Sequence, residues 1–264
     1  MKNKISKSSE LMWVLGLVLV ALGVCICKKA DLGVSMIAAP TFILFEFLAP
    51  LWSGFSVGMV EYLFQGIILL TLCCVVQRFN WRYLLAFLTA VIYGYIMDLW
   101  ILILGTEPFQ YIWLRWIMLF VGDAVTALGV ACFFRTYMPL QVHELFVAET
   151  VDRYKFKLHK TKLIFDLSFL TLSIVLALVL FRDVASFDWK TIFYASFHSI
   201  GIGTIITTFI NSPIINFTGK LLDKIFDYTP LFPKLETILK RKKVNNKFTF
   251  FFTKAMHPIL IKIT

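Results

Sequence analysis

The sequence lacks several motifs that identify common enzyme sites. It has no His-Glu-x-x-His motif of zinc proteases and no phosphate-binding loop. Its cysteines occur as Cys25-x-Cys27, the pair Cys73-Cys74 and the single Cys132, without the spacing of a zinc site. We therefore expect no enzymatic activity, no cofactor and no metal, and we interpret the cysteines as small packing residues.

Charged residues are scarce. Asp, Glu, Lys and Arg make up 16% of the 264 residues, whereas 59% are hydrophobic and the mean hydropathy is +0.80. A water-soluble domain of this size could not bury so much apolar surface, so we expect the lipid bilayer to be the solvent. Each of six segments approaches the roughly 20 apolar residues that cross a hydrocarbon core of about 30 Å. The predicted spans are 11–27, 57–77, 82–104, 112–134, 163–181 and 191–217.

The chain has no linker rich in glycine and serine, and no signal-peptide cleavage site follows the first apolar segment. We therefore predict an all-α polytopic membrane protein with a retained first helix. Its membrane domain covers 1–227, and a basic, aromatic tail that is cytoplasmic or interfacial covers 228–264. Such a tail suits an anionic membrane surface. A tail without a specific role is an equal alternative.

A short sequence repeat indicates an internal duplication. Ala21–Val24 (Ala-Leu-Gly-Val) recurs as Ala127–Val130, and at the same offset Gly16 matches Gly122. A duplicated membrane unit is a common way to build a secondary transporter around a central site. Each copy has three predicted spans, and an odd number of spans makes the second copy inverted relative to the first. The predicted copies cover about 11–104 and about 112–217.

Positive charge predicts the orientation of the chain. The net charge is +10, and basic residues gather between Arg135 and Lys162 and in the run 240–243. In so apolar a chain, these residues mark the cytoplasmic face rather than a nucleic-acid site. We therefore predict cytoplasmic N- and C-termini. Only Lys28 and Lys29 break this pattern.

A short segment follows the first span of each copy, at 32–51 and at 138–150. The second segment carries His143 and Glu144, which are costly to place in lipid. We predict that both segments form short helices that dip into the protein or lie at its interface. Such backbone is tolerated at membrane depth only where protein or a wet cavity covers it. A spanning helix at 32–51 is the alternative, but it would place the basic block 135–162 outside, against the positive-inside rule.

Acids inside the predicted spans are the first candidates for a site. Asp98 lies in the third span, and Asp123 lies in the fourth, between the two glycines of its repeat motif. A carboxyl at membrane depth is costly to keep and is therefore a candidate proton or cation site. The structural alternative is an aspartate paired with Lys28, Lys29 or Arg135, or hydrogen-bonded across a helix interface.

Two further acids, Glu61 and Asp166, occupy corresponding positions near the starts of spans in the two copies. Each lies about one helical turn inside the predicted boundary. Snorkelling, or contact with a helix N-terminus, explains them without a functional role.

Polar residues after the first spans supply other candidates. Gly33 and Ser35 predict a turn that leads into a helix, with Ser35 as a candidate N-cap. A free helix N-terminus inside a membrane protein suits an anionic group, and an ordinary capped interfacial helix is the alternative. His143 and Glu144 form either a titrating pair or a solvated helix face, and Asn211 lies in either a broken or a kinked helix. The candidate substrate- or ion-binding residues are Asp98, Asp123, Asp31, Ser35, Lys28, Lys29, His143, Glu144 and Asn211.

Three stretches resemble the YczE/YyaS/YitT group of bacterial membrane proteins: Ala21–Pro40, Glu144–Phe181 and Gly201–Lys224. The similarity covers about 11–227, and its most specific part is Ala-Asp-Leu-Gly-Val-Ser. Met36 stands where members often have proline. The resemblance implies a bacterial origin and the plasma membrane. It implies no activity, because the group is broadly uncharacterised.

The inverted repeat and the acids at membrane depth favour a secondary transporter or permease for a small solute, with Asp98 and Asp123 as coupling or gating residues. An anionic solute is one candidate. The alternative is a non-transporting accessory or scaffold protein for an enzyme or export system at the cytoplasmic face, docked through 144–162 and the basic tail. A homodimer is one candidate assembly, and we expect no nucleic-acid partner.

Overall fold

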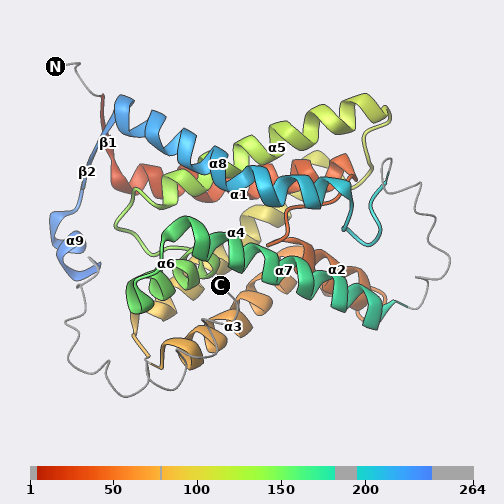
Figure 1. Ribbon diagram of the computed structural model, residues 1–264, viewed down its shortest axis with the longest axis horizontal. Coiled ribbons are helices and arrows are strands. Elements are labelled where there is room, and N and C mark those ends of the chain that lie inside the picture. The colour runs from red at the N-terminus through yellow and green to blue at the C-terminus, as the bar shows by residue number, and fades with distance from the viewer. Residues whose placement is uncertain (1–4, 78, 182–194, 240–264) are drawn as a thin grey trace.

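The computed structural model describes residues 5–77, 79–181 and 195–239 (Figure 1). Most of the predicted tail, including the basic run 240–243, lies outside the described residues. The elements are β1 (Ile5–Ser8), α1 (Ser9–Ala30), α2 (Ala39–Leu48), α3 (Val57–Val76), α4 (Arg82–Leu104), α5 (Ile112–Phe133), α6 (Val142–Tyr154), α7 (Leu158–Leu180), α8 (Ile202–Ile225), β2 (Phe226–Thr229) and α9 (Pro233–Leu239).

Five helices are long and apolar enough to cross a membrane: α1, α3, α4, α5 and the Lys160–Leu180 part of α7. They agree with five of the six predicted spans. Large apolar side chains on these helices are exposed on the surface of the protein, as Leu102 of α4 is at 82%. Lipid is the solvent that suits such a surface, and the chain is an integral, multi-pass membrane protein.

The helix α8 differs from the predicted sixth span. It begins at Ile202, because the residues before it form a turn in which His198 and Ser199 have positive φ. The predicted positions 191–194 lie outside the described residues. The second half of α8 carries lysine and aspartate, so its apolar part is only Ile202–Asn211. A sixth span therefore remains a prediction.

Two short helices follow α1 and α5, at the places where the sequence predicts them. With 10 residues in α2 and 13 in α6, they are about 15 Å and about 20 Å long. Both are shorter than a hydrocarbon core of about 30 Å. The N-cap of α2 is Ala38 and not Ser35, which corrects the predicted cap. The Ser35 carbonyl instead accepts the amides of Ala38 and Ala39 in the preceding turn.

Glycines bring α1 and α5 into close contact. A Cβ on Gly23 would lie 2.5 Å from the carbonyl oxygen of Gly122, and one on Gly129 would lie 3.0 Å from that of Gly16. Because the residue numbers run in opposite directions, the two helices are antiparallel. In the sequence repeat Gly16 matches Gly122 and Gly23 matches Gly129. Each contact therefore joins the first glycine of one copy to the second glycine of the other.

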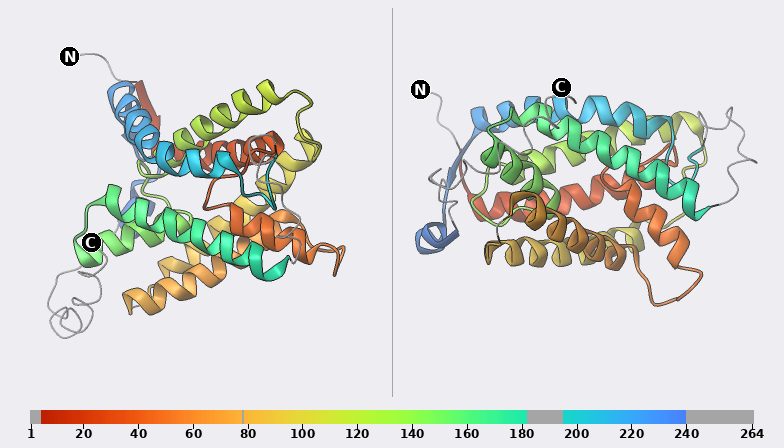
Figure 2. Two further views of the ribbon diagram at one scale, coloured as in Figure 1. Left: turned by 45° about the vertical axis from the view of Figure 1, so that its right-hand side comes forward. Right: turned by 60° about the horizontal axis from the view of Figure 1, so that its bottom comes forward.

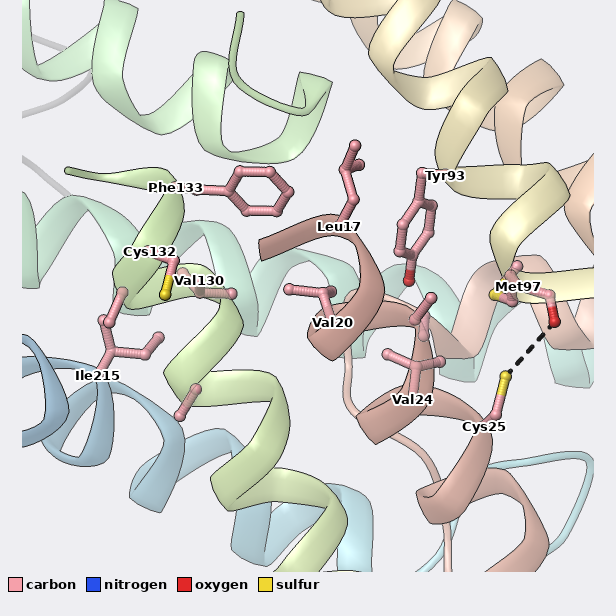
Figure 3. Packing of buried hydrophobic residues seen from close by; sticks show 14 of the residues in the cluster. Leu17, Val20, Val24, Cys25, Tyr93, Met97, Val130, Cys132, Phe133 and Ile215 are labelled. Atoms are coloured by element: carbon pink, nitrogen blue, oxygen red, sulfur yellow. Dashed lines mark hydrogen bonds between the residues drawn. The ribbon is translucent and has the colours of Figure 1, made fainter. Parts of the chain in front are cut away.

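One large hydrophobic cluster lies on both sides of α1, and a second is formed by α3, α4, α6 and α7. Figure 3 shows Val20 and Val24 of α1 between Val130 of α5 and Tyr93 of α4, all in one buried cluster. Cys25 belongs to this cluster, and its Sγ donates to the Met97 carbonyl at 3.7 Å. Its role is packing, as the sequence predicts for the cysteines. The core therefore fixes α1 between α4 and α5.

The helices form two groups, which the left view of Figure 2 shows one above the other. In one group α1 packs on α5 and α5 packs on α8, and in the other α2 packs on α7 and α3 packs on α6. The groups are joined by α4, which packs on α1 and α3, and by α8, which packs on α5 and α7. These contacts are symmetric between the first four helices and the last four. If α1 is exchanged with α5, α2 with α6, α3 with α7 and α4 with α8, each contact named above becomes another contact named above.

The α4–α5 end is the end of the bundle where α4 leads into α5. It also contains the C-terminus of α1, because the Phe109 amide donates to the Lys29 carbonyl. It contains the N-terminus of α3 as well, because Asp98 of α4 binds the Gly58 amide. At the opposite end β1 and β2 pair in parallel (Figure 1).

Lys28 and Lys29, the exceptions to the charge pattern, lie at the α4–α5 end and are held by protein atoms. Lys28 Nζ lies 2.8 Å from Glu46 Oε1. Lys29 Nζ donates to the Leu104 carbonyl. Because these charges are bound within the fold, the two lysines are a weaker guide to orientation than the exposed basic residues at the opposite end.

We expect an impermeant maleimide to label Ser53→Cys and Thr106→Cys from the same side of the membrane. Both positions are exposed connections at the α4–α5 end, which the charge pattern predicts to be external. The measurement is labelling of intact cells with Cys73 and Cys74 replaced by serine, because Cys74 is exposed. Asn80→Cys, exposed at the opposite end, is the control and should react only after permeabilisation. Labelling of Ser53 and Thr106 from opposite sides would contradict this fold.

Candidate functional site

Buried polar side chains of α3 connect the N-terminal ends of the two short helices. Thr41, in the first turn of α2, donates to Glu61 Oε2 at 2.5 Å, and Gln65 Nε2 donates to Glu61 Oε1 at 2.8 Å. The amide of Val142, at the start of α6, donates to Gln65 Oε1 at 3.3 Å. The partial positive charges of both helix N-termini therefore lie next to a buried carboxylate, which they stabilise.

His143, in the first turn of α6, also contacts Glu61. Its Nε2 lies 3.4 Å from Glu61 Oε1, and both side chains are buried. The rings of Phe165 and Phe169 of α7 pack edge-on to the imidazole, at centroid distances of 6.4 and 5.6 Å. These apolar rings surround the pair, and an apolar environment strengthens the electrostatic contact between the imidazole and the carboxylate.

α7 adds a buried ion pair, in which Lys162 Nζ lies 3.3 Å from Asp166 Oδ1. Glu144, also in the first turn of α6, is only 5% exposed. Burial raises the pKa of Glu144; His143 and Lys162 oppose this rise, and the nearby Asp166 adds to it. We call the whole set the central cluster: Thr41, Glu61, Gln65, His143, Glu144, Lys162 and Asp166.

Three polar atoms of the central cluster have no hydrogen-bond partner among the described residues: His143 Nδ1, Glu144 Oε2 and Asp166 Oδ2. An unpartnered buried polar atom costs about 1–3 kcal/mol, and each such case needs an explanation. All three atoms belong to α6 and α7, whereas Glu61 on α3 has partners for both carboxyl oxygens. These three atoms on α6 and α7 are therefore the ones available to bind a small ligand.

Asp98 caps α3. Its Oδ1 accepts the Gly58 amide at 2.8 Å and its Oδ2 accepts the Ser56 hydroxyl at 2.7 Å, contacts that stabilise a helix N-terminus. Ser56 also lies in a Gly-x-Ser-x-Gly match at Gly54–Gly58. This match follows a turn rather than a strand, and the Ser56 hydroxyl also accepts the Met59 amide as the N-cap. It is therefore a helix start and not the nucleophile elbow of a hydrolase.

Asp123 and Asn211 lie away from the central cluster, on the neighbouring helices α5 and α8. Both are buried, and Asp123 Oδ2 and Asn211 Oδ1 have no partner among the described residues. Because α1 lies between α4 and α5 (Figure 3), the structure does not bring Asp98 and Asp123 together. Asp123 and Asn211 form at most a second, smaller polar site.

Lys28 belongs to a group of ionic contacts at the α4–α5 end. Lys28 Nζ contacts Glu46 and the Ser199 hydroxyl, at 2.8 and 2.7 Å. His198 Nδ1 lies 3.0 Å from Glu46 Oε2, and the His198 ring stacks on Phe181 at 3.7 Å. These contacts, which we call the end group, join α1, α2, the end of α7 and the turn before α8.

Asp31 is also held by the fold. It accepts hydrogen bonds from Arg115 Nη1 at 3.3 Å and from the Ser196 hydroxyl at 2.6 Å. Two residues later Gly33 has φ 107°, and a Cβ there would lie 2.6 Å from the Gly201 amide nitrogen. The Asp-Leu-Gly-Val-Ser segment therefore docks on the start of α8, and its charged residues meet protein partners.

Sequence reasoning did not assign Glu61, Lys162 or Asp166 to a site. The snorkelling interpretation is wrong, because Glu61 is 4% exposed and Asp166 0%. The other interpretation, contact with a helix N-terminus, agrees with the position of Glu61 beside the first turn of α2. A signal was present: the two acids correspond between the copies, and Lys162 lies one helical turn before Asp166. His143 and Glu144 were candidates, and their burial excludes the solvated-face alternative.

A family model of unknown function, DUF6198, matches residues 7–220. The chain belongs to this family. No curated protein and no solved structure matches it. The DUF6198 match includes the whole central cluster, but it supplies no activity, and the similarity to the YczE/YyaS/YitT group stays a prediction.

Proposed function

We propose that this protein is a secondary transporter of a small solute and that the central cluster is its binding site. The single observation that carries the proposal is the burial of titratable side chains at the N-termini of two short helices. Charged groups inside a membrane protein are costly, and they typically mark an ion or substrate pathway. Secondary transporters place such groups at the ends of interrupted helices.

Two inverted copies provide the framework for this site. Two observations support an approximate two-fold relation between the copies. The glycines of α1 and α5 make reciprocal contacts, and the helix contacts named above are the same when corresponding helices are exchanged. Thr41, Glu61 and Gln65 come from the first copy, and the other members of the central cluster come from the second. The site lies between the copies, where inverted-repeat transporters bind their solutes.

Contacts at both ends of the bundle suit alternating access. The end group holds one end through Lys28, Glu46 and His198. At the opposite end Arg135 binds Asp223 through two bonds of 2.6 and 2.7 Å. Each set joins different helices with a few polar contacts, so either end could open while the other stays closed.

A thermal-shift screen of purified protein against a metabolite library tests this function. A solute at about 100 times its Kd should stabilise the wild type by about 2.7 kcal/mol. Glu61→Gln should remove that shift, because it takes away the carboxylate but keeps the shape of the side chain. Uptake of the identified solute into proteoliposomes should be lost in the same variant.

Asp98→Asn and Asp123→Asn are the matched controls, because each removes a carboxylate outside the central cluster. Both should keep the shift of the wild type with the solute, although Asp98→Asn lowers the melting temperature by weakening the α3 cap. A solute whose effect depends on Asp123 and not on Glu61 would place the site on α5 and α8. Binding without uptake would contradict transport and favour the accessory role.

A further inference from the structure

The central cluster holds more acid than base. Three carboxyls, on Glu61, Glu144 and Asp166, share it with Lys162 and His143, and every one of these residues is at most 6% exposed. Even with a charged imidazole, three ionised carboxyls would leave an excess negative charge. A dry site does not keep such a charge uncompensated, so it takes up a proton or another cation.

Glu144 is the carboxyl for which no hydrogen bond or ion pair to another side chain is found among the described residues. The contacts of Glu61 with Thr41, Gln65 and His143 satisfy both its oxygens. Asp166 has Lys162 at 3.3 Å. Glu144 Oε2 is buried without a partner among the described residues, so the proton belongs on Glu144.

We propose that Glu144 binds an exchangeable proton and that this proton is the cation coupled to transport. The coupling rests on the proposed transport function, whereas proton binding by Glu144 does not. When water reaches the opened cluster, the Glu144 carboxyl loses its proton to water and becomes a carboxylate. Lys162 and the N-terminus of α6 then stabilise the new charge, and the proton is taken up again before the cluster closes.

A metal cation suits the cluster less well than a proton. Within the described residues, no group of three or more His, Cys, Asp or Glu side chains is arranged to hold a metal ion. Lys162 adds a positive charge that would repel one. The titratable groups around Glu144 are His143 on its own helix, Glu61 beside His143, Tyr93 on α4, and Lys162 and Asp166 on α7.

Infrared difference spectra of the full-length protein, recorded across a pH titration, test this proposal. The wild type should show a protonated-carboxyl band that disappears as the pH rises. Glu144→Gln should lose this band. Glu149→Gln changes another glutamate of the same helix and should keep it. Asp166→Asn should move the midpoint to lower pH, because it removes a like charge beside Glu144.

Each outcome decides the proposal. A full band in Glu144→Gln overturns it, as does a midpoint that Asp166→Asn leaves unchanged. If Glu144→Gln does not fold, Glu144→Asp serves instead and should keep the band with a shifted midpoint. Stabilisation by sodium that depends on Glu144 would replace the proton with sodium and leave the transport function standing. A Glu144 band without any transported solute would leave proton binding standing and contradict transport.

Discussion

Gly23→Ala should destabilise this protein, although alanine favours helices over glycine by about 1 kcal/mol. The added Cβ would lie 2.2 Å from Thr126 Oγ1 and 2.5 Å from the Gly122 carbonyl oxygen. The second contact is with backbone, so no side-chain rotation relieves it and α1 must move away from α5. Such overpacking costs about 1–3 kcal/mol, occasionally more. The expected result is a lower melting temperature in detergent and less monodisperse protein.

Gly66→Ala is the control, because its Cβ would meet only the ring of Phe87, at 3.3 Å. It should be neutral or stabilising. Gly122→Ala should cost about as much as Gly23→Ala, since the two glycines face each other in a reciprocal contact. The double variant should cost less than the sum, because the first substitution already separates the helices that the second would push apart. Equal tolerance of alanine at Gly23 and Gly66 would contradict the close contact between α1 and α5.

Much of this architecture could be predicted from the sequence because membrane burial leaves a simple pattern. Runs of apolar residues mark helices, and five of the predicted spans match helices long enough to cross. The short helices α2 and α6 could also be predicted. The start of α8 could not, because the turn at His198 and Ser199 depends on contacts with Glu46 and Val34, far away in the chain.

The site could be predicted only in part, for a similar reason. His143 and Glu144 can be predicted as candidates because they are polar residues in an otherwise apolar segment, and both lie in the central cluster. The positions of Glu61 and Asp166 near predicted span boundaries indicate a place close to the membrane surface and give no sign that the side chains are buried. Their burial comes instead from α2 and α6, which fold against α3 and α7 and cover them. This burial depends on contacts between helices that are far apart in the chain, so the sequence around each acid does not reveal it.

Lys162→Met should be among the most destabilising substitutions in the described chain. It leaves Asp166, which has no exposed surface, without its ion-pair partner at 3.3 Å. Removing one member of a buried pair typically costs 3–5 kcal/mol, because the remaining charge stays buried and uncompensated. The expected result, of about that size, is a loss in the free energy of unfolding measured by denaturant titration in mixed micelles. Lys160→Met, two residues away and exposed, should change stability by no more than about 0.5 kcal/mol.

The double variant Lys162→Met/Asp166→Leu separates stability from function. Replacing a whole buried ion pair by apolar side chains is often neutral or stabilising, so the double variant should regain most of the loss. It should still fail to respond to the transported solute, because the central cluster would lack two of its charges. If stability and the solute response both returned, the pair would be a structural element outside the site. If stability returned without the solute response, the two charges would be needed for binding and not for folding. That need would explain why the protein keeps two costly charges at membrane depth.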